Sequence, residues 1–275
     1  MSVIFEWKQE DFEKLINNCA TEPVTPYILK YLPKDGRLLE AGCGSGRFVY
    51  YLNSLGYKIT GLEVGDKMVD LVNQVYPHLD ILRGDVRDLP FPDESFSGLL
   101  SLGVIEHIVE GMERPISEMW RVLKKGGYAL VIVPSFNYIR RIKYPLGIYH
   151  IRSLAGLLKR AIISKLSNSP SEKIYKTSLK TLKKTDFHSW PALGDFYEYR
   201  LTKKQFEDQL LAAGFSIIDS VPTSQIDGVY HEFGSVFVSL KNHTFYPNAV
   251  GKWLNSTLSK IPFCHNHMHL CVVKK

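Results

Sequence analysis

Three glycines, Gly42, Gly44 and Gly46, stand at every second position of the sequence, shortly after two leucines and the acid Glu40. Glycine allows a sharp turn and lets a ligand approach bare backbone, and the amphipathic run that follows begins a helix whose first N–H groups point toward such a ligand. The pattern predicts a strand, a tight turn and a helix that bind a nucleotide-type cofactor. A dinucleotide fingerprint would need a further glycine where Arg47 stands, and the phosphate-binding GxxxxGK[ST] pattern is also absent.

Two more carboxylates follow the next predicted strands. Glu63 lies at the end of the strand expected over residues 58–64, where a carboxylate can accept two hydrogen bonds from ribose hydroxyls. Asp85 lies at the end of the strand expected over residues 80–86, where it could accept the exocyclic amine of an adenine. Any one of these acids alone would be read as a surface carboxylate. Three acids at successive strand ends, Glu40 included, favour a cofactor site at the ligand-binding edge of an open α/β sheet.

One histidine follows the fourth predicted strand. His107 lies just past residues 98–105, beside the expected reaction site, and the unperturbed pKa of histidine near 6.5 suits proton removal at neutral pH. His107 is therefore the candidate general base. The alternative is that it caps the following loop or holds Glu106.

The succession of motifs resembles the class I methyltransferases that use S-adenosylmethionine, in particular the small-molecule type related to quinone and sterol methylation. The resemblance rests on Glu40-x-Gly42-x-Gly44-x-Gly46, on Glu63, on Gly84-Asp85-Val86 and on the segment Arg121 to Gly127 before the fifth strand. It covers residues 30–135 closely, and two departures, Ser97 and Gly65, fall at structural positions.

The resemblance implies S-adenosyl-L-methionine as methyl donor and S-adenosyl-L-homocysteine as product, with in-line transfer to O, N or C of a small-molecule or lipid-like acceptor. The cofactor-binding residues that it implies are Glu40, Gly42, Cys43, Gly44, Gly46, Glu63, Asp85, Val86 and Leu102. Because the methyl group is already activated by the positive sulfur, the protein mainly positions the nucleophile and manages its proton.

Strands and helices alternate with short connections from residue 37 onward, which predicts a parallel sheet in an α/β fold. We expect a Rossmann-like doubly wound sheet, for which the resemblance implies seven strands with the last one antiparallel. An N-terminal helical cap over residues 1–33 precedes a methyltransferase domain over residues 34–275, in which residues 135–198 form a substrate-side insert. A last helix is expected over residues 247–260, with Val250, Trp253 and Leu254 facing inward.

Positive charge is concentrated in the insert. The chain of 275 residues carries a formal net charge of +6, and from Tyr138 to Asp186 there are twelve Lys and Arg against two acids. The segment fits a lid over a lipophilic or anionic substrate, peripheral contact of residues 152–165 with an anionic membrane, an RNA or protein acceptor, or a solvated basic flap. Nucleic acid is disfavoured because the fourth strand is not followed by an Asn/Asp-Pro-Pro-aromatic element. A non-catalytic cofactor-binding scaffold is a further alternative, against which the complete cofactor motif argues.

The remaining features point to an ordinary globular protein. No apolar run approaches the roughly 18 residues of a membrane span, the N-terminus does not resemble a secretory signal, and the four cysteines lack a CxxC spacing. These features predict a cytoplasmic protein with reduced thiols. His265, His267 and His269 share one face of a strand-like segment, but short metal sites on a strand are uncommon without a carboxylate or thiolate partner, and we expect no metal there. The oligomeric state does not follow from the sequence.

Overall fold

The structure is a computed structural model that describes residues 9–143, 187–190, 196–241 and 244–275. The chain divides into two compact units, which are described separately. Unit 1 comprises residues 1–133, 204–221 and 270–275, and unit 2 comprises residues 134–203 and 222–269.

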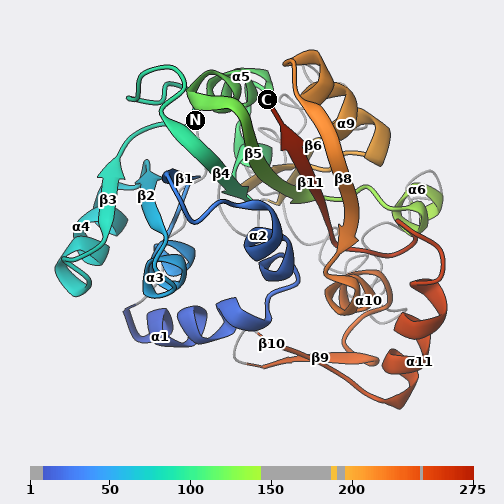
Figure 1. Cartoon of the computed structure of the whole chain (residues 1–275). Helices are drawn as coiled ribbons and strands as arrows, with labels where there is room; N and C mark the ends of the chain where they lie inside the picture. The colour runs from blue at the N-terminus through green and yellow to red at the C-terminus, as the bar shows by residue number, and fades with distance from the viewer. Residues whose placement is uncertain (1–8, 144–186, 191–195, 242–243) are drawn as a thin grey trace, which may run out of the picture. The chain divides into compact units, whose positions relative to one another are not determined.

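A seven-stranded sheet with the order β3-β2-β1-β4-β5-β11-β8 confirms the predicted fold class (Figure 1). The strands are β1 (Arg37–Ala41), β2 (Lys58–Glu63), β3 (Asp80–Arg83), β4 (Phe96–Leu102), β5 (Leu123–Pro134), β8 (Ser216–Thr223) and β11 (Met268–Lys274). The pairs β1–β2, β1–β4, β2–β3 and β4–β5 are parallel. Parallel strands covered on both faces are apolar almost throughout, as the buried residues of β1 and β4 are.

Strand β11 runs antiparallel to β5, as the resemblance implied. The N–H of Gly126 donates to the carbonyl of Lys275, whereas the N–H of Ser135 donates to the carbonyl of His267. Residue numbers therefore rise along one strand while they fall along the other, which is the antiparallel arrangement.

The helices of unit 1 bury one face each against their surroundings. They are α1 (Gln9–Asn18), η1 (Cys19–Thr21), α2 (Thr25–Tyr31), α3 (Arg47–Ser54), α4 (Asp66–Val75), η2 (Ile105–His107), α5 (Glu113–Val122) and α9 (Lys203–Ala212), of which the first residue of α9 belongs to unit 2. In α3 the buried residues are Phe48, Val49 and Leu52. In the N-terminal segment Phe12, Leu15 and Cys19 are buried. The helical nature of the N-terminal segment is thus confirmed from Gln9 onward.

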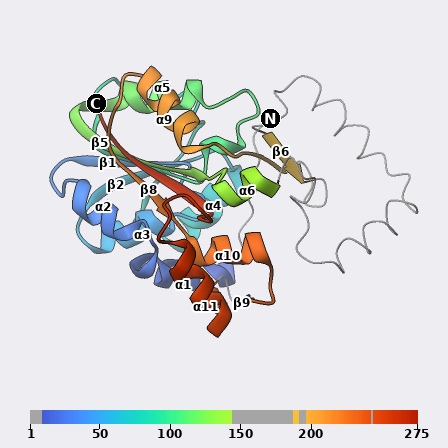
Figure 2. The ribbon, with the colours of Figure 1, turned by 90° about the vertical axis from the view of Figure 1, so that its right-hand side faces the viewer.

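Unit 2 combines short helices, which are labelled in Figure 2, with two antiparallel strand pairs. Its described elements are α6 (Tyr138–Lys143), β6 (Phe187–Trp190), β7 (Phe196–Tyr199), α10 (Gln225–Phe233), β9 (Val238–Lys241), β10 (Thr244–Pro247) and α11 (Ala249–Leu258). Strand β6 pairs with β7, and β9 with β10. Most of the predicted basic insert, residues 144–186 and 191–195, lies outside the described residues.

The orientation predicted for the last helix is wrong. Val250 is 49% and Trp253 63% exposed on α11, instead of facing inward. The inward face is instead set by Gly251, where a Cβ atom would lie 2.2 Å from the carbonyl oxygen of Phe237. On the same face of α11, Asn255 Oδ1 forms a hydrogen bond of 3.0 Å with His265 Nε2. Close backbone approach and a polar contact, rather than apolar packing, therefore orient this helix.

A buried ion pair joins α6 to α10 within unit 2. Arg140, only 1% exposed, donates from Nε to Glu232 Oε1 at 2.5 Å and from Nη1 to the carbonyl of Ser135 at 2.5 Å. Lys143 Nζ lies 3.3 Å from the other Glu232 oxygen, and Asn137 Nδ2 donates to Glu232 Oε1. Burial alone would raise the pKa of Glu232, but the charges of Arg140 and Lys143 hold it below its ordinary value.

Replacing Glu232 by glutamine should destabilise unit 2, because Arg140 would keep its buried charge without a counter-charge. Losing one partner of a buried pair costs about 3–5 kcal/mol, which urea unfolding at pH 7 would measure. Since the pKa of Glu232 is lowered on folding, its stabilisation is present above the unfolded pKa and is lost as the pH falls through the folded pKa. The matched control is Asp208→Asn, which breaks an exposed pair with Lys204 and should change stability by less than about 1 kcal/mol. Equal unfolding midpoints for wild type and Glu232→Gln would contradict this prediction.

Candidate active site

The glycine turn connects β1 to α3 and is held by its neighbours in the sheet. The N–H groups of Gly42 and Cys43 donate to the carbonyl of Leu62 at 2.8 and 2.9 Å, which attaches the turn to β2. Gly42 has φ +83°, and a Cβ atom there would lie 2.4 Å from Val104 Cγ1. Gly46 has φ +69°, and a Cβ atom there would lie 2.6 Å from Ile81 Cδ1. Both positions require glycine for conformation and for space, so the turn follows a path that the sequence predicted.

The Glu63 carboxylate binds the glycine turn directly. Its Oε2 accepts a hydrogen bond of 2.9 Å from the N–H of Gly44, while Oε1 accepts hydrogen bonds of 2.9 Å from the N–H groups of Val64 and Gly65. Glu63 is the last residue of β2, so the structure brings two predicted site residues, Glu63 and Gly44, into contact. A carboxylate has about four acceptor positions. With three of them used by backbone amides, its orientation is set and its capacity is not exhausted.

Asp85 is held by a residue that the sequence analysis did not identify. Strand β3 ends at Arg83, earlier than predicted, and Asp85 lies in the turn that follows. The guanidinium group of Arg87 donates hydrogen bonds to the Asp85 carboxylate: Nε lies 3.0 Å from both oxygens and Nη2 lies 2.6 Å from Oδ2. Hydrogen bonding to Arg87 lowers the pKa of Asp85, although partial burial opposes this. The Asp-x-Arg spacing in the sequence was the signal for this pair, because it places both side chains on one tight turn.

Glu40 is buried at the start of the turn, with only 3% exposure. Burial raises its pKa to about 8, against the opposing charge of Arg47 and a hydrogen bond from the N–H of Val49. Arg47 forms its ion pair with Glu22, at 2.6 Å, and so connects the turn to the N-terminal segment. Among the described residues, Glu40 Oε2 has no hydrogen-bond partner. In the sequence Arg47 only excluded a dinucleotide fingerprint, and its role as a link was not predicted.

The loop after β4 packs onto the glycine turn. Val104 contributes the atoms that exclude a side chain at Gly42, and the N–H of Gly103 donates to the carbonyl of Ile132 on β5. Leu102, which ends β4, and Val86, 9% exposed, are the remaining apolar residues of the predicted set. The structure thus brings Leu102 to the same edge of the sheet as the turn.

His107 ends the short helix η2 and is mostly buried, with 8% exposure. Its Nε2 atom lies 3.7 Å from Glu106 Oε1, and the Glu106 side chain is 2% exposed. The contact agrees with the alternative that His107 holds Glu106, and the role of His107 as a base stays a prediction.

The contacts that the structure describes for His265, His267 and His269 differ from one another. His265 contacts Asn255, His269 lies edge-on against Phe263, and His267 stacks on His231 with ring centroids 4.1 Å apart and planes 9° apart. Their predicted common face is therefore divided among separate contacts.

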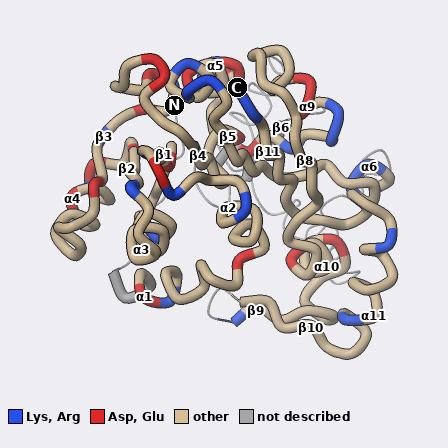
Figure 3. The backbone as a smooth tube through the Cα atoms, viewed as in Figure 1, with Lys and Arg blue, Asp and Glu red and all other residues tan. Residues whose placement is uncertain are grey.

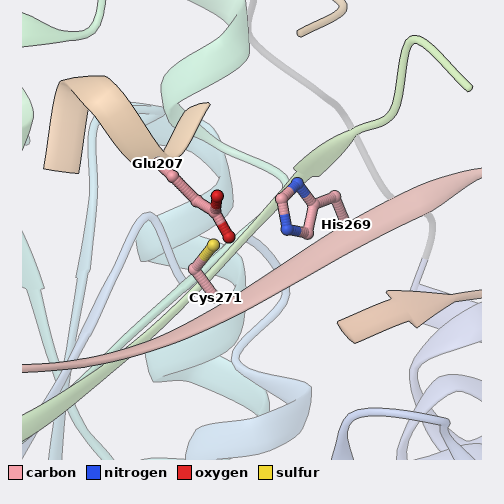
Figure 4. Close-up of side chains that lie close together, drawn as sticks. All are labelled: Glu207, His269 and Cys271. Atoms are coloured by element: carbon pink, nitrogen blue, oxygen red, sulfur yellow. The ribbon is translucent and has the colours of Figure 1, made fainter. Parts of the chain in front are cut away.

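Two other groups of potential metal ligands occur in the described part of the chain. In unit 2 they are Asp227, His231 and His267. There the parallel stacked rings direct their nitrogen lone pairs side by side instead of toward one point, and Arg140 Nη2 lies 2.8 Å from His267 Nδ1. Figure 4 shows Glu207 from α9 near Cys271 on β11, with His269 two residues earlier on the same strand. We assign no metal to either group.

The match to a known family lies in the segment that contains this site. Residues 39–131 match a family described as a methyltransferase domain, and they include all the predicted cofactor-binding residues and His107. Residues 39–131 therefore form a methyltransferase domain. The fold agrees: a crystal structure of an S-adenosylmethionine-dependent methyltransferase from Methanosarcina mazei covers 91% of this chain and 97% of its own, with a TM-score of 0.56 at 17% identity.

Curated relatives match the methyltransferase domain over part of their length. A probable S-adenosylmethionine-dependent methyltransferase of Mycolicibacterium smegmatis is 34% identical over 52% of this chain and 50% of its own. The phosphatidylethanolamine N-methyltransferase of Cereibacter sphaeroides is 31% identical over 41% of this chain and 56% of its own. The demethylmenaquinone methyltransferase of Chlorobaculum tepidum is 29% identical over 37% and 42%. The chain thus spans about half the length of these relatives.

Replacing Glu40 by glutamine should flatten the pH dependence of stability. Because burial raises the pKa of Glu40 to about 8 from 4.5, the folded state retains a proton that the unfolded state releases, and stability falls as the pH rises from 4.5 to 8. The upper limit of this loss is roughly 5 kcal/mol. Thermal unfolding at pH 5 and pH 8.5 should show a smaller drop in midpoint for Glu40→Gln than for wild type. The control Glu13→Gln, at an exposed site on α1, should behave as wild type, and parallel curves for all three proteins would refute the prediction.

Proposed function

We propose that the protein transfers the methyl group of S-adenosylmethionine to a small-molecule or lipid-like acceptor. The observation that carries this proposal is the contact between the Glu63 carboxylate and the N–H of Gly44, beside a turn that admits no side chain at Gly42 or Gly46. A fixed carboxylate next to bare backbone, at the end of β2 where parallel sheets bind ligands, suits the ribose of an adenosyl group. The named relatives that act on phosphatidylethanolamine and demethylmenaquinone support the class of acceptor.

The residues around the turn fit the cofactor chemically. Glu63 keeps acceptor capacity for ribose hydroxyls, and Glu40 has one carboxyl oxygen without a partner among the described residues. Asp85 would accept the adenine amine with lone pairs that Arg87 leaves open, between the apolar side chains of Val86 and Leu102. When bound, the cofactor supplies an electrophilic methyl group on a positively charged sulfur. The glycine turn and Cys43 would hold its methionine part.

His107 is the residue proposed to manage the proton of the acceptor. A neutral imidazole at Nε2 or Nδ1 can take the proton that an O or N nucleophile loses as the new bond to carbon forms. Glu106, 3.7 Å away, would orient the ring and stabilise its protonated form. Residues 135–198 are proposed to form the acceptor side, with the N-terminal cap over residues 1–33. If the acceptor is lipid-like, the protein also has to reach a membrane. The proposal therefore includes peripheral contact with an anionic membrane.

A second candidate is a protein that binds the cofactor without transferring methyl. The [4+2]-cyclase SpnF, which is named for a different reaction, shares the fold with a TM-score of 0.52 at 17% identity, over 96% of this chain and 93% of its own. The fold therefore does not decide the reaction. Cofactor binding without S-adenosylhomocysteine formation across quinone, phospholipid, RNA and protein acceptors would favour this candidate. Methyl transfer to RNA or protein alone would show that the acceptor is one of these and not a lipid-like molecule.

Glu63→Gln should weaken cofactor binding, because a neutral amide accepts hydrogen bonds from ribose less strongly and cannot accept all three backbone N–H groups. Hydrogen bonds to a charged group contribute about 1.5–3 kcal/mol, so we expect affinity for S-adenosylmethionine to fall about 10–100-fold in calorimetric titration. The exposed control Glu13→Gln should bind as wild type. Thermal unfolding checks that Glu63→Gln is folded, and wild-type affinity in the folded variant would remove Glu63 from the site.

His107→Ala should bind the cofactor normally and turn over more slowly. Loss of a general base typically reduces the rate about 10²–10⁴-fold, measured as S-adenosylhomocysteine formed with the acceptor found active. The rate lost should be partly recovered at high pH, where the acceptor loses its proton unaided; a purely structural role would not give this recovery. Full turnover by His107→Ala would exclude His107 as the base.

A further inference from the structure

Exposed apolar side chains gather in one short part of unit 2. Among the described residues, fourteen large hydrophobic side chains are exposed, and six of them lie between residues 236 and 261, with exposed fractions from 47% to 72%. Two of them, Val250 and Trp253, lie three residues apart on α11, and we call these two residues the apolar face. Leu240 and Tyr246 are left out because the register of the β9–β10 hairpin places them on opposite faces. Single exposed hydrophobic residues are ordinary, whereas a cluster of this kind marks an interaction site.

The packing of α11 explains why the apolar face points outward. Gly251 and Asn255 face the body of unit 2, through the close approach to Phe237 and the hydrogen bond to His265. Val250 and Trp253, three residues apart, lie on the opposite side of the helix. The helix is capped by Asn248, whose Oδ1 accepts from the N–H of Gly251 and whose Nδ2 donates to the carbonyl of Val236. The outward orientation is thus fixed by local contacts that need no partner.

The charges around the apolar face have one sign. Lys241, Lys252 and Lys260 are exposed, and no aspartate or glutamate occurs anywhere from Phe233 to the last residue, Lys275. Figure 3 shows the β9–β10 hairpin and α11 with blue segments and no red ones, whereas α10 in the same unit carries acids. A surface of this kind is complementary to a negatively charged partner.

We propose that the apolar face, with its three lysines, docks unit 2 onto the surface of an anionic lipid bilayer. Tryptophan and tyrosine are enriched at membrane interfaces because their rings have both an apolar and a polar part, and lysines beside them are attracted to anionic headgroups. No helix in the described residues is long and apolar enough to cross a bilayer, so the contact is peripheral. This inference rests on the proposed function, because docking at a bilayer would bring the enzyme to a lipid-like acceptor.

Co-sedimentation with vesicles tests the docking surface on the full chain without cofactor. Wild type should bind vesicles of equal parts phosphatidylcholine and phosphatidylglycerol, and bind pure phosphatidylcholine weakly. The double variant Val250→Ser/Trp253→Ser should lose at least about tenfold in affinity. Lys252→Gln/Lys260→Gln should lose about fivefold per lysine at low salt and less at high salt.

Matched controls lie in unit 1 on side chains of similar exposure. Leu211→Ser/Ile218→Ser replaces residues that are 50% and 44% exposed, and Lys124→Gln/Lys125→Gln replaces two exposed lysines; both should bind as wild type. Equal binding by the Val250→Ser/Trp253→Ser variant, or no binding by wild type, would overturn the proposal. A wild-type dimer that this variant dissociates in ultracentrifugation would assign the apolar face to a second copy of the chain instead. The Val250→Ser/Trp253→Ser variant should bind S-adenosylmethionine in calorimetric titration with wild-type affinity. Loss of vesicle binding with unchanged cofactor affinity is then a failure of docking and not of the proposed reaction.

Discussion

The Glu63 carboxylate, which accepts hydrogen bonds from Gly44, Val64 and Gly65, is the interaction on which the cofactor edge of unit 1 depends. One side chain at the end of β2 thereby fixes the path of the backbone after β1. The amides of Gly42 and Cys43 reinforce the connection through the carbonyl of Leu62. Because backbone groups buried at such a turn must find partners, the contacts that orient the Glu63 carboxylate also satisfy the turn itself.

The three acids at this edge have different electrostatic environments. Glu40 is buried and has a pKa of about 8, so it is largely protonated at neutral pH. Asp85 has a lowered pKa because it accepts hydrogen bonds from Arg87, and it is ionised. Glu63 is oriented by backbone amides. A set of carboxyl groups at one sheet edge therefore presents one neutral and two acceptor groups with distinct tasks, which a count of acids in the sequence does not reveal.

Unit 2 places its charged and apolar residues in an unusual way. Arg140 and Glu232 are buried together, while Trp253 and Val250 are exposed. The buried pair is compatible with folding because Ser135, Asn137 and Lys143 complete its hydrogen bonds. The exposed residues remain outside because Gly251 and Asn255 occupy the inward face of α11. In both cases specific polar and backbone contacts override the tendency of apolar residues to fill the interior.

The sequence by itself determined the α/β class and the glycine turn, since alternation of apolar strands with amphipathic helices and the spacing of Gly42, Gly44 and Gly46 are local properties. The number of seven strands came from the family resemblance. It also placed Glu63 and Asp85 near the end of a strand, which parallel topology converts into proximity. Only the tertiary structure decided which side chains meet: Arg87 with Asp85, Arg47 with Glu22, Glu106 with His107, and Arg140 with Glu232. The first and third of these pairs are close in sequence, yet their geometry depends on turns whose shape no residue pattern specifies. The orientation of α11 could not be predicted for the same reason: hydrophobic spacing identifies an apolar side of a helix, whereas the side that turns inward is chosen by the surface it must pack against.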